Sequence, residues 1–128
     1  MMADLNIPWT RLCLGACLAA LALTPAHAAQ RVPVTSVKPL LIAAIDRGES
    51  HGGLVGESAT FMHGRFGSTA PIEIDVKTLR ALPQPGCKRL EVTTRQNAVR
   101  EATKQAPARK DLIYQVSYCR DGRFPDSK

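Results

Sequence analysis

The chain has few aromatic residues and few cysteines, which excludes several classes of protein. It contains one tryptophan, two tyrosines, three phenylalanines and four cysteines in 128 residues. No C-x-x-C pair is present, so a thioredoxin-like redox motif is excluded. The glycine-rich stretch GGLVG (52–56) lacks the lysine and hydroxyl pair of a phosphate-binding loop. His51 and His63 fit no familiar ligand spacing, and we therefore expect neither a cofactor nor a metal site.

The first 29 residues have the pattern of a secretory signal peptide. A start that contains Arg11 precedes an apolar run (12–23) and the small-residue ending Ala26-His27-Ala28. The apolar run is shorter than the roughly 20 residues that a membrane-spanning helix needs. We expect cleavage after residue 28 or 29, a periplasmic or secreted protein, and no stable membrane span after cleavage. An uncleaved anchor and a lipoprotein with Cys17 at its start are the alternatives.

Cleavage would leave residues 30–128 as one small domain. It would remove the only tryptophan, Trp9, and two of the four cysteines. The net charge would stay at +6, because one basic residue, Arg11, and one acidic residue, Asp4, are lost together. The mature protein is therefore expected to be basic and poor in aromatic residues.

Two segments in the second half of the chain alternate as strands do. In each of the segments 88–94 and 112–118, apolar side chains recur at every second position. An antiparallel register with Cys87 opposite Cys119 puts both apolar sets on one face. A shift of one residue would put them on opposite faces. We therefore predict this register for the two strands.

The two cysteines of that register are expected to form a structural disulfide. Cys87 and Cys119 would lie opposite each other, and Arg95 would meet Asp111 with the correct sign for an ion pair. In an oxidising compartment, an isolated cysteine pair is more often a disulfide than a metal site. Closing a loop of this size stabilises the fold by roughly 3 kcal/mol in the chain-entropy model.

A further strand and a helix complete the predicted fold. The segment 71–77 alternates without a break, which is typical of a strand with one buried face. Upstream, an apolar stripe at helical spacing predicts a helix that Ser36 caps and Gly48 ends; its residues are Val37, Leu40, Leu41, Ala44 and Ile45. The sequence therefore predicts an α+β fold: a small antiparallel sheet of at least three strands, one N-terminal helix packed on it, and one disulfide.

The stretch HGGLVGESAT (51–60) resembles two motifs of serine esterases, the oxyanion loop HGG and the turn around the nucleophilic serine. In those enzymes the two motifs lie on different elements of a large doubly wound sheet, for which a domain of about 100 residues is too short. Thr60 stands where the second glycine of G-x-S-x-G belongs, and no histidine follows His63. We therefore interpret the resemblance as accidental and expect no catalytic residue.

The surrounding segment, residues 48–67, holds six of the nine glycines. It is predicted to be a surface loop or an irregular edge strand. Three of its side chains suit contact with a protein partner, or else complete the core: Phe61, Met62 and Phe66. An alternative function uses the 49–63 loop as the site of a small envelope-polymer hydrolase, with general acids and bases among Glu49, Glu57, Ser58 and His63.

A second long connection, residues 95–110, is strongly basic. It contains a single carboxylate, that of Glu101, and five basic residues: Arg95, Arg100, Lys104, Arg109 and Lys110. The first part of the connection predicts a short helix that Pro107 would end. Such a patch attracts anionic ligands, while the lack of aromatic stacking platforms argues against nucleic acid.

Without a catalytic constellation, the sequence favours an exported, non-catalytic protein-binding module. We expect its partner to be a protein of the cell envelope, and the module to serve as an accessory component of an envelope-spanning assembly. Binding of an anionic ligand by the 95–110 loop and hydrolysis of an envelope polymer by the 49–63 loop are the alternatives.

Overall fold

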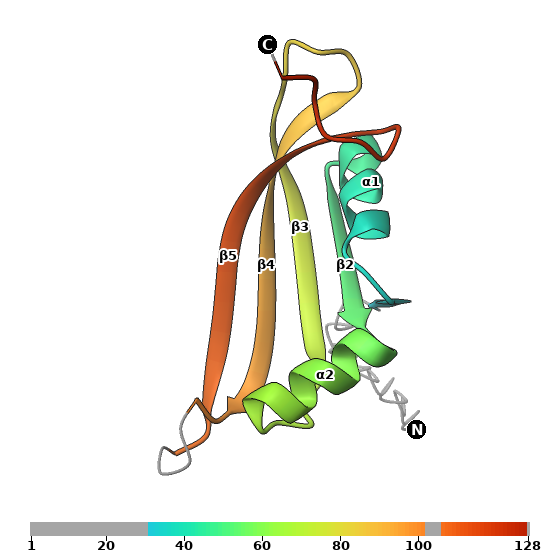
Figure 1. The fold of residues 1–128 in the computed structure, drawn as a ribbon. Coiled ribbons are helices and arrows are strands. Elements are labelled where there is room, and N and C mark those ends of the chain that lie inside the picture. The colour runs from blue at the N-terminus through green and yellow to red at the C-terminus, as the bar shows by residue number, and fades with distance from the viewer. Residues whose placement is uncertain (1–30, 102–105, 128) are drawn as a thin grey trace, which may run out of the picture.

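Five strands and two helices make up the fold in a computed structural model, which describes residues 31–101 and 106–127 (Figure 1). Their order along the chain is β1 (Val32–Val34), α1 (Lys38–Arg47), β2 (Glu49–Leu54), α2 (Glu57–Phe66), β3 (Ile72–Ala81), β4 (Cys87–Val99) and β5 (Ala108–Cys119). The predicted signal peptide, residues 1–29, lies outside the described residues, so its cleavage stays a prediction. The α+β class is confirmed.

The sheet is mixed, which corrects the prediction of a purely antiparallel one. Its strand order is β1-β2-β3-β4-β5, and β1 runs parallel to β2 while all other neighbours are antiparallel. The helix α1 connects β1 to β2 as a crossover, as a parallel pair requires. The strand β1 has three residues and contains Pro33, which an edge strand tolerates. It is too short to show an alternating pattern in the sequence.

The glycine-rich segment 48–67 is not a loop, and the fold has two helices rather than the predicted one. It forms β2, which pairs with β3, and then α2. Three of its six glycines lie at the ends of helices: Gly48 ends α1, and Gly56 and Gly67 flank α2 with φ angles of 80° and 58°. The Gly67 N–H donates to the His63 carbonyl. Glycine is favoured at such positive φ angles. The prediction treated these residues as marks of a loop.

The predicted register between β4 and β5 is confirmed. Cys87 is opposite Cys119 and bonded to it, with 3.9 Å between the Cα atoms. Arg95 is opposite Asp111, and Arg95 Nε lies 3.4 Å from Asp111 Oδ1. The strand β4 continues to Val99, so the short helix predicted after residue 95 does not form there. Backbone pairing with β3 and β5 outweighs the local helical pattern at this point.

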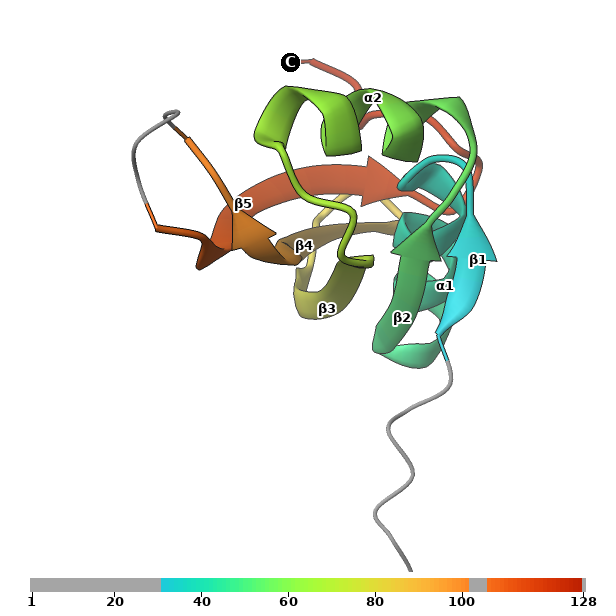
Figure 2. The ribbon, with the colours of Figure 1, turned by 90° about the horizontal axis from the view of Figure 1, so that it is seen from below.

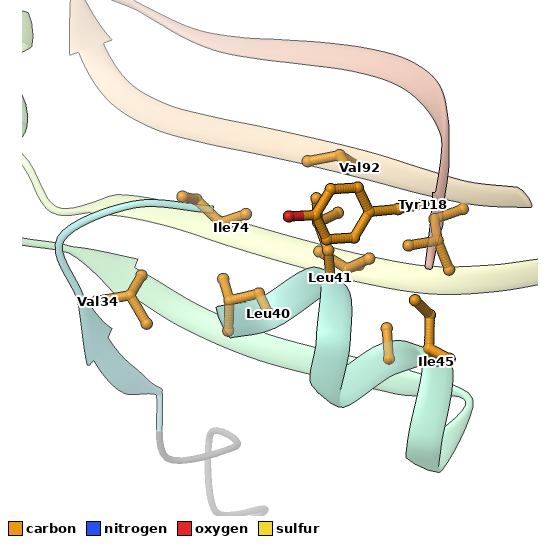
Figure 3. Packing of buried hydrophobic residues seen from close by; sticks show 10 residues of the cluster. Val34, Leu40, Leu41, Ile45, Ile74, Val92 and Tyr118 are labelled. Atoms are coloured by element: carbon orange, nitrogen blue, oxygen red, sulfur yellow. The ribbon is translucent and has the colours of Figure 1, made fainter. Parts of the chain in front are cut away.

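The core lies between α1 and one face of the sheet (Figure 3). The helix buries Leu40, Leu41, Ala44 and Ile45, as its apolar stripe predicts. Gly48 ends α1 in the left-handed conformation, and its N–H donates to the Ala44 carbonyl. At the other end, Val37 rather than Ser36 is the N-cap, without a side-chain hydrogen bond.

Both helices lie on the same face of the sheet, and the opposite face is open (Figures 1 and 2). The helix α1 covers the β2 side of this face, and α2 crosses the end of the sheet where β3 begins (Figure 1). Within residues 31–101 and 106–127, no helix has the length and apolar character needed to cross a membrane. Because α1 and α2 lie at these two places, a large part of β5 has no helix over it (Figure 1).

Candidate functional site

The outer half of β5 is an uncovered edge of the sheet. Strand β5 is the last in the strand order, so only β4 pairs with it. Every residue from 108 to 115 is exposed, on both faces of the strand. Three adjacent apolar side chains lie in this half, exposed to 62% (Leu112), 60% (Ile113) and 40% (Tyr114). An edge strand with exposed apolar residues is a template for pairing with another strand.

The backbone groups of β5 that face outward follow from its ladder with β4. The Cys119 N–H donates to the Arg123 carbonyl and the Cys87 N–H to the Gln84 carbonyl, so this opposing pair exchanges no backbone hydrogen bond. Bonded and non-bonded pairs alternate in an antiparallel ladder, and the register is unbroken as far as Gln96. Alternate residues of β5 therefore point N–H and C=O away from β4. These residues are Asp111, Ile113, Gln115 and Ser117.

A groove of about 270 Å³ adjoins this edge on the helix-covered face. Side chains of α2 form one wall and those of β4 and β5 form the other; the apolar ones are Met62, Phe66, Val99 and Leu112. The Gln96 amide fixes the loop after α2, because its Nε2 donates to the carbonyls of Ser68 and Ala70. The groove thus extends the apolar surface of Leu112 toward α2.

On the opposite face, an ion-pair network covers the middle of the sheet. Asp75 is its centre: Arg31 Nη1 lies 2.8 Å and His51 Nδ1 lies 2.7 Å from Asp75 Oδ1. Arg95 Nη1 lies 3.6 Å from Asp75 Oδ2. His51 is therefore oriented by a carboxylate, which sequence reasoning missed because its partner is on another strand. The alternation of residues 71–77 predicts a strand, but it does not show which residue of a neighbouring strand lies opposite Asp75.

The same contacts shift the pKa of Asp75. Partial burial by itself raises this pKa, but hydrogen bonds from Arg31 and His51 outweigh the burial, and the pKa of Asp75 lies below its ordinary value. The carboxylate is thus held in its charged form. A charged acceptor leaves the His51 ring only the role of donor at Nδ1. The network thus links β2, β3 and β4 on this face through His51, Asp75 and Arg95.

Three of the five predicted basic residues form ion pairs within the protein. Arg95 Nε and Arg109 Nε lie 3.4 Å and 3.1 Å from Asp111 Oδ1. Lys110 Nζ lies 3.1 Å from Glu101 Oε2. The patch is therefore divided: Arg95 belongs to the open sheet face, and Lys110 borders the groove.

The other two basic residues differ in what the structure describes. Arg100 is exposed beside the end of α2, because its backbone N–H donates to the Phe66 carbonyl over 2.9 Å. Lys104 lies outside the described residues. Arg100, Lys110 and the C-terminal end of α2 therefore lie at the same end of the groove.

The residues proposed for partner contact are divided between two surfaces. Met62 and Phe66 line the groove, whereas Phe61 is 72% exposed. Phe61 lies on α2 one position before Met62, so it points away from the groove wall. Two of the three are thus placed beside the β5 edge.

The structure separates Glu49 from the other three residues of the alternative hydrolase, because Glu57, Ser58 and His63 all lie on α2. Glu49 begins β2, while Glu57 and Ser58 begin α2 beyond the other end of that strand. Six strand residues separate them by roughly 17 Å to 20 Å. In the part of the chain that the structure describes, no three His, Cys, Asp or Glu side chains gather as metal ligands would.

The comparisons with known proteins assign no family. No protein-family model, no curated protein and no solved structure matches the chain. The fold and the site define a small, disulfide-bonded α+β domain with an open sheet edge.

Sequence reasoning placed Leu112 and Tyr114 on one apolar face with Val116 and Tyr118, but it did not identify β5 as an edge strand. A signal was present, because three successive apolar residues (112–114) point to both faces of a strand. In the last strand of a small sheet, such a run indicates an apolar edge. Strand order, which the sequence does not state, was needed to use that signal.

Proposed function

We propose that this protein is an exported, non-catalytic protein-binding module that takes an extended segment of a partner protein at the β5 edge. The uncovered run of Leu112, Ile113 and Tyr114 is the observation that supports the proposal. In this mode of recognition, main-chain hydrogen bonds hold the added strand and side-chain pockets select it. The groove beside Leu112 provides such a pocket.

The protection that edge strands usually have is confined to the start of β5 and does not extend to its apolar run. Natural edges are blocked by charges, prolines, bulges or a covering element. In β5, Arg109, Lys110 and Asp111 precede the apolar run, but none interrupts it. The bulge of this strand pair, between Gln96 and Val99 on β4, lies opposite the start of β5 and not opposite the apolar run. An apolar stretch that is exposed to solvent on an edge strand supports a binding role.

Export is the second part of the proposal. The signal-peptide pattern in residues 1–29 and the Cys87–Cys119 disulfide both support an oxidising compartment. The partner is then a protein of the cell envelope, and an accessory role in an envelope-spanning assembly fits a module without chemistry of its own.

Photo-cross-linking from the edge tests the proposal. A photoreactive residue is placed at Gln115 in the full chain, in the cells that make the protein, and at exposed Leu79 as a control. We expect a discrete protein adduct from Gln115 that is absent from Leu79 and is lost on Ile113→Pro. Proline there removes an outward N–H but leaves the ladder with β4 intact. Equal adducts from both positions, or an adduct that Ile113→Pro does not change, would rule the proposal out.

A further inference from the structure

Charge at one end of the groove restricts the partner further. Resting on the proposed function, we infer that the added strand is antiparallel to β5 and has three successive apolar residues, followed two positions after the last of them by an acidic residue. The apolar run matches Leu112, Ile113 and Tyr114, and the acid matches Lys110. The class of partner is therefore an extended peptide segment of defined pattern.

The apolar part of this pattern follows from the two faces of β5. A strand paired with β5 has alternate side chains on each face. Residues opposite Leu112 and Tyr114 lie on the helix-covered face beside the groove, and the residue opposite Ile113 lies on the open face. All three positions of β5 are exposed and apolar. An apolar residue at each opposing position would bury this surface most completely.

The acidic part follows from the cations around the groove. Lys110 lines the groove, Arg100 is bonded through its backbone to the end of α2, and Arg65 is in the last turn of that helix. Two carboxylates, Asp111 and Glu101, line the groove. Asp111 Oδ1 lies 3.1 Å from Arg109 Nε and 3.4 Å from Arg95 Nε, so the carboxylate that pairs with Lys110 is Glu101. Its pair with Lys110 is solvent-exposed, with side-chain exposures of 54% and 48%, and such pairs contribute little. An acidic residue of the partner would complement this excess of positive charge.

The direction of the strand decides where the acid falls. Antiparallel pairing is slightly more stable per residue than parallel pairing. In an antiparallel partner, the residues that follow the apolar run lie toward the start of β5. The second of them is opposite Lys110 and shares its face of the sheet. An acid after the run, rather than before it, is therefore the mark of this arrangement.

A second copy of the chain fits the edge less well. A symmetric pairing centred on Ile113 would match Leu112 of each copy with Tyr114 of the other. It would also place Lys110 of one copy opposite Val116 of the other, so the cations would gain no carboxylate. Each copy carries a net charge of +6, which opposes association. Charge complementarity thus favours a different, acidic partner.

Peptide selection tests the pattern. A phage library of random twelve-residue peptides is selected on the disulfide-bonded protein and counter-selected on the Ile113→Pro variant. A second counter-selection on Ile113→Asp keeps the test usable if the proline variant does not fold, as judged by urea unfolding. We expect enriched peptides to have three apolar residues and an Asp or Glu two positions later. Exchanging that acid for its amide should weaken binding about two- to five-fold, and Lys110→Glu should reverse the preference.

The outcomes separate the two proposals. Peptides that depend on Ile113 but show no acid after the apolar run would overturn the partner pattern and leave strand addition standing. Failure to select any peptide that depends on Ile113 would overturn both proposals. Sedimentation that shows a dimer of the wild-type protein, lost on Ile113→Pro, would assign the edge to a second copy and overturn the acidic partner.

Discussion

At the scale of single residues, packing explains the glycine at position 52, which lies in the stretch that resembles an esterase motif. A Cβ atom built at this position would lie 2.7 Å and 2.9 Å from the two methyl carbons of Leu40, and 3.1 Å from the Val32 carbonyl oxygen. Leu40 is only 3% exposed, so its methyl groups have little room to move. The glycine thus permits close approach of α1 to β2. This close packing is sufficient to account for a glycine at position 52.

A matched pair of substitutions checks this account. Gly52→Ala should lower the free energy of unfolding by about 1–3 kcal/mol, because the added methyl group overpacks the contact with Leu40. Gly53→Ala, where the nearest atom is the Ile72 carbonyl oxygen at 4.0 Å, should leave stability unchanged or raise it by about 0.5–1 kcal/mol. Urea unfolding measures both. Equal losses in the two variants would show that the contact is unimportant.

Asp75 makes stability depend on pH. Its pKa is lower in the folded protein than in the unfolded chain, so the unfolded chain binds more protons once the pH falls below about 4. The stability that this carboxylate contributes is present above that pH and is lost as the pH falls through the folded-state pKa. The loss belongs to the acid range and not to neutral pH.

Asp75→Asn should therefore be less stable than the wild type at pH 6, and the difference should shrink as the pH falls toward 2.5. The amide keeps the shape but cannot carry the charge that Arg31 and His51 stabilise. Urea midpoints across this pH range give the comparison, with exposed Asp126→Asn as the control. A difference between wild type and Asp75→Asn that stays constant with pH would contradict the assignment.

At the scale of elements, the disulfide joins the far ends of β4 and β5. Cys87 and Cys119 are 32 residues apart in sequence and buried, at the end of the ladder opposite the apolar edge. Closing a loop of this length limits the unfolded chain. The bond also holds the terminal residue pair of β5, an edge strand that pairs with β4 alone in the described sheet.

Replacing both cysteines by alanine should lower the free energy of unfolding by about 2–4 kcal/mol. The measurement is urea unfolding of the oxidised wild-type protein and of the Cys87→Ala, Cys119→Ala variant. A reducing agent should bring the wild type close to the variant and leave the variant unchanged. A variant as stable as the oxidised protein would show that the bond has no such role.

At the scale of the whole molecule, two helices on one face leave a sheet with three different surfaces. One face is covered, the other holds the ion-pair network around Asp75, and the β5 edge is apolar. Positive charge around the groove adds a long-range component to binding there. Salt screens such charges over about 8–10 Å at ordinary ionic strength.

Binding of an acid-containing strand at this edge should therefore weaken as salt increases. We expect the affinity of a selected acidic peptide to fall several-fold between about 0.05 M and 0.5 M salt. Its amide counterpart, which binds through the backbone and apolar contacts alone, should change much less. Fluorescence anisotropy measures both. The same salt dependence for the two peptides would place the charge effect elsewhere.

The sequence predicted the strands β4 and β5 well, but it did not predict the β2–α2 segment or the contacts on the open face. The register of β4 and β5 followed from local alternation and from two cysteines, because a one-residue slip would expose an apolar set. The β2–α2 segment was missed because its glycines serve helix ends and the Leu40 contact. The pairing of His51 with Asp75 was missed because neighbours across strands are far apart in sequence.

The sequence by itself determined the α+β class, the buried stripe of α1, the β4–β5 register and the disulfide, since periodicity and side-chain chemistry act over a few residues. Tertiary structure alone decided that β1 runs parallel to β2, that α2 lies over one end of the sheet, and that β5 is last in the strand order. Whether Leu112 and Tyr114 are core or surface depends on what covers them. Strand order and helix placement set that coverage, and they arise from contacts that no local pattern encodes.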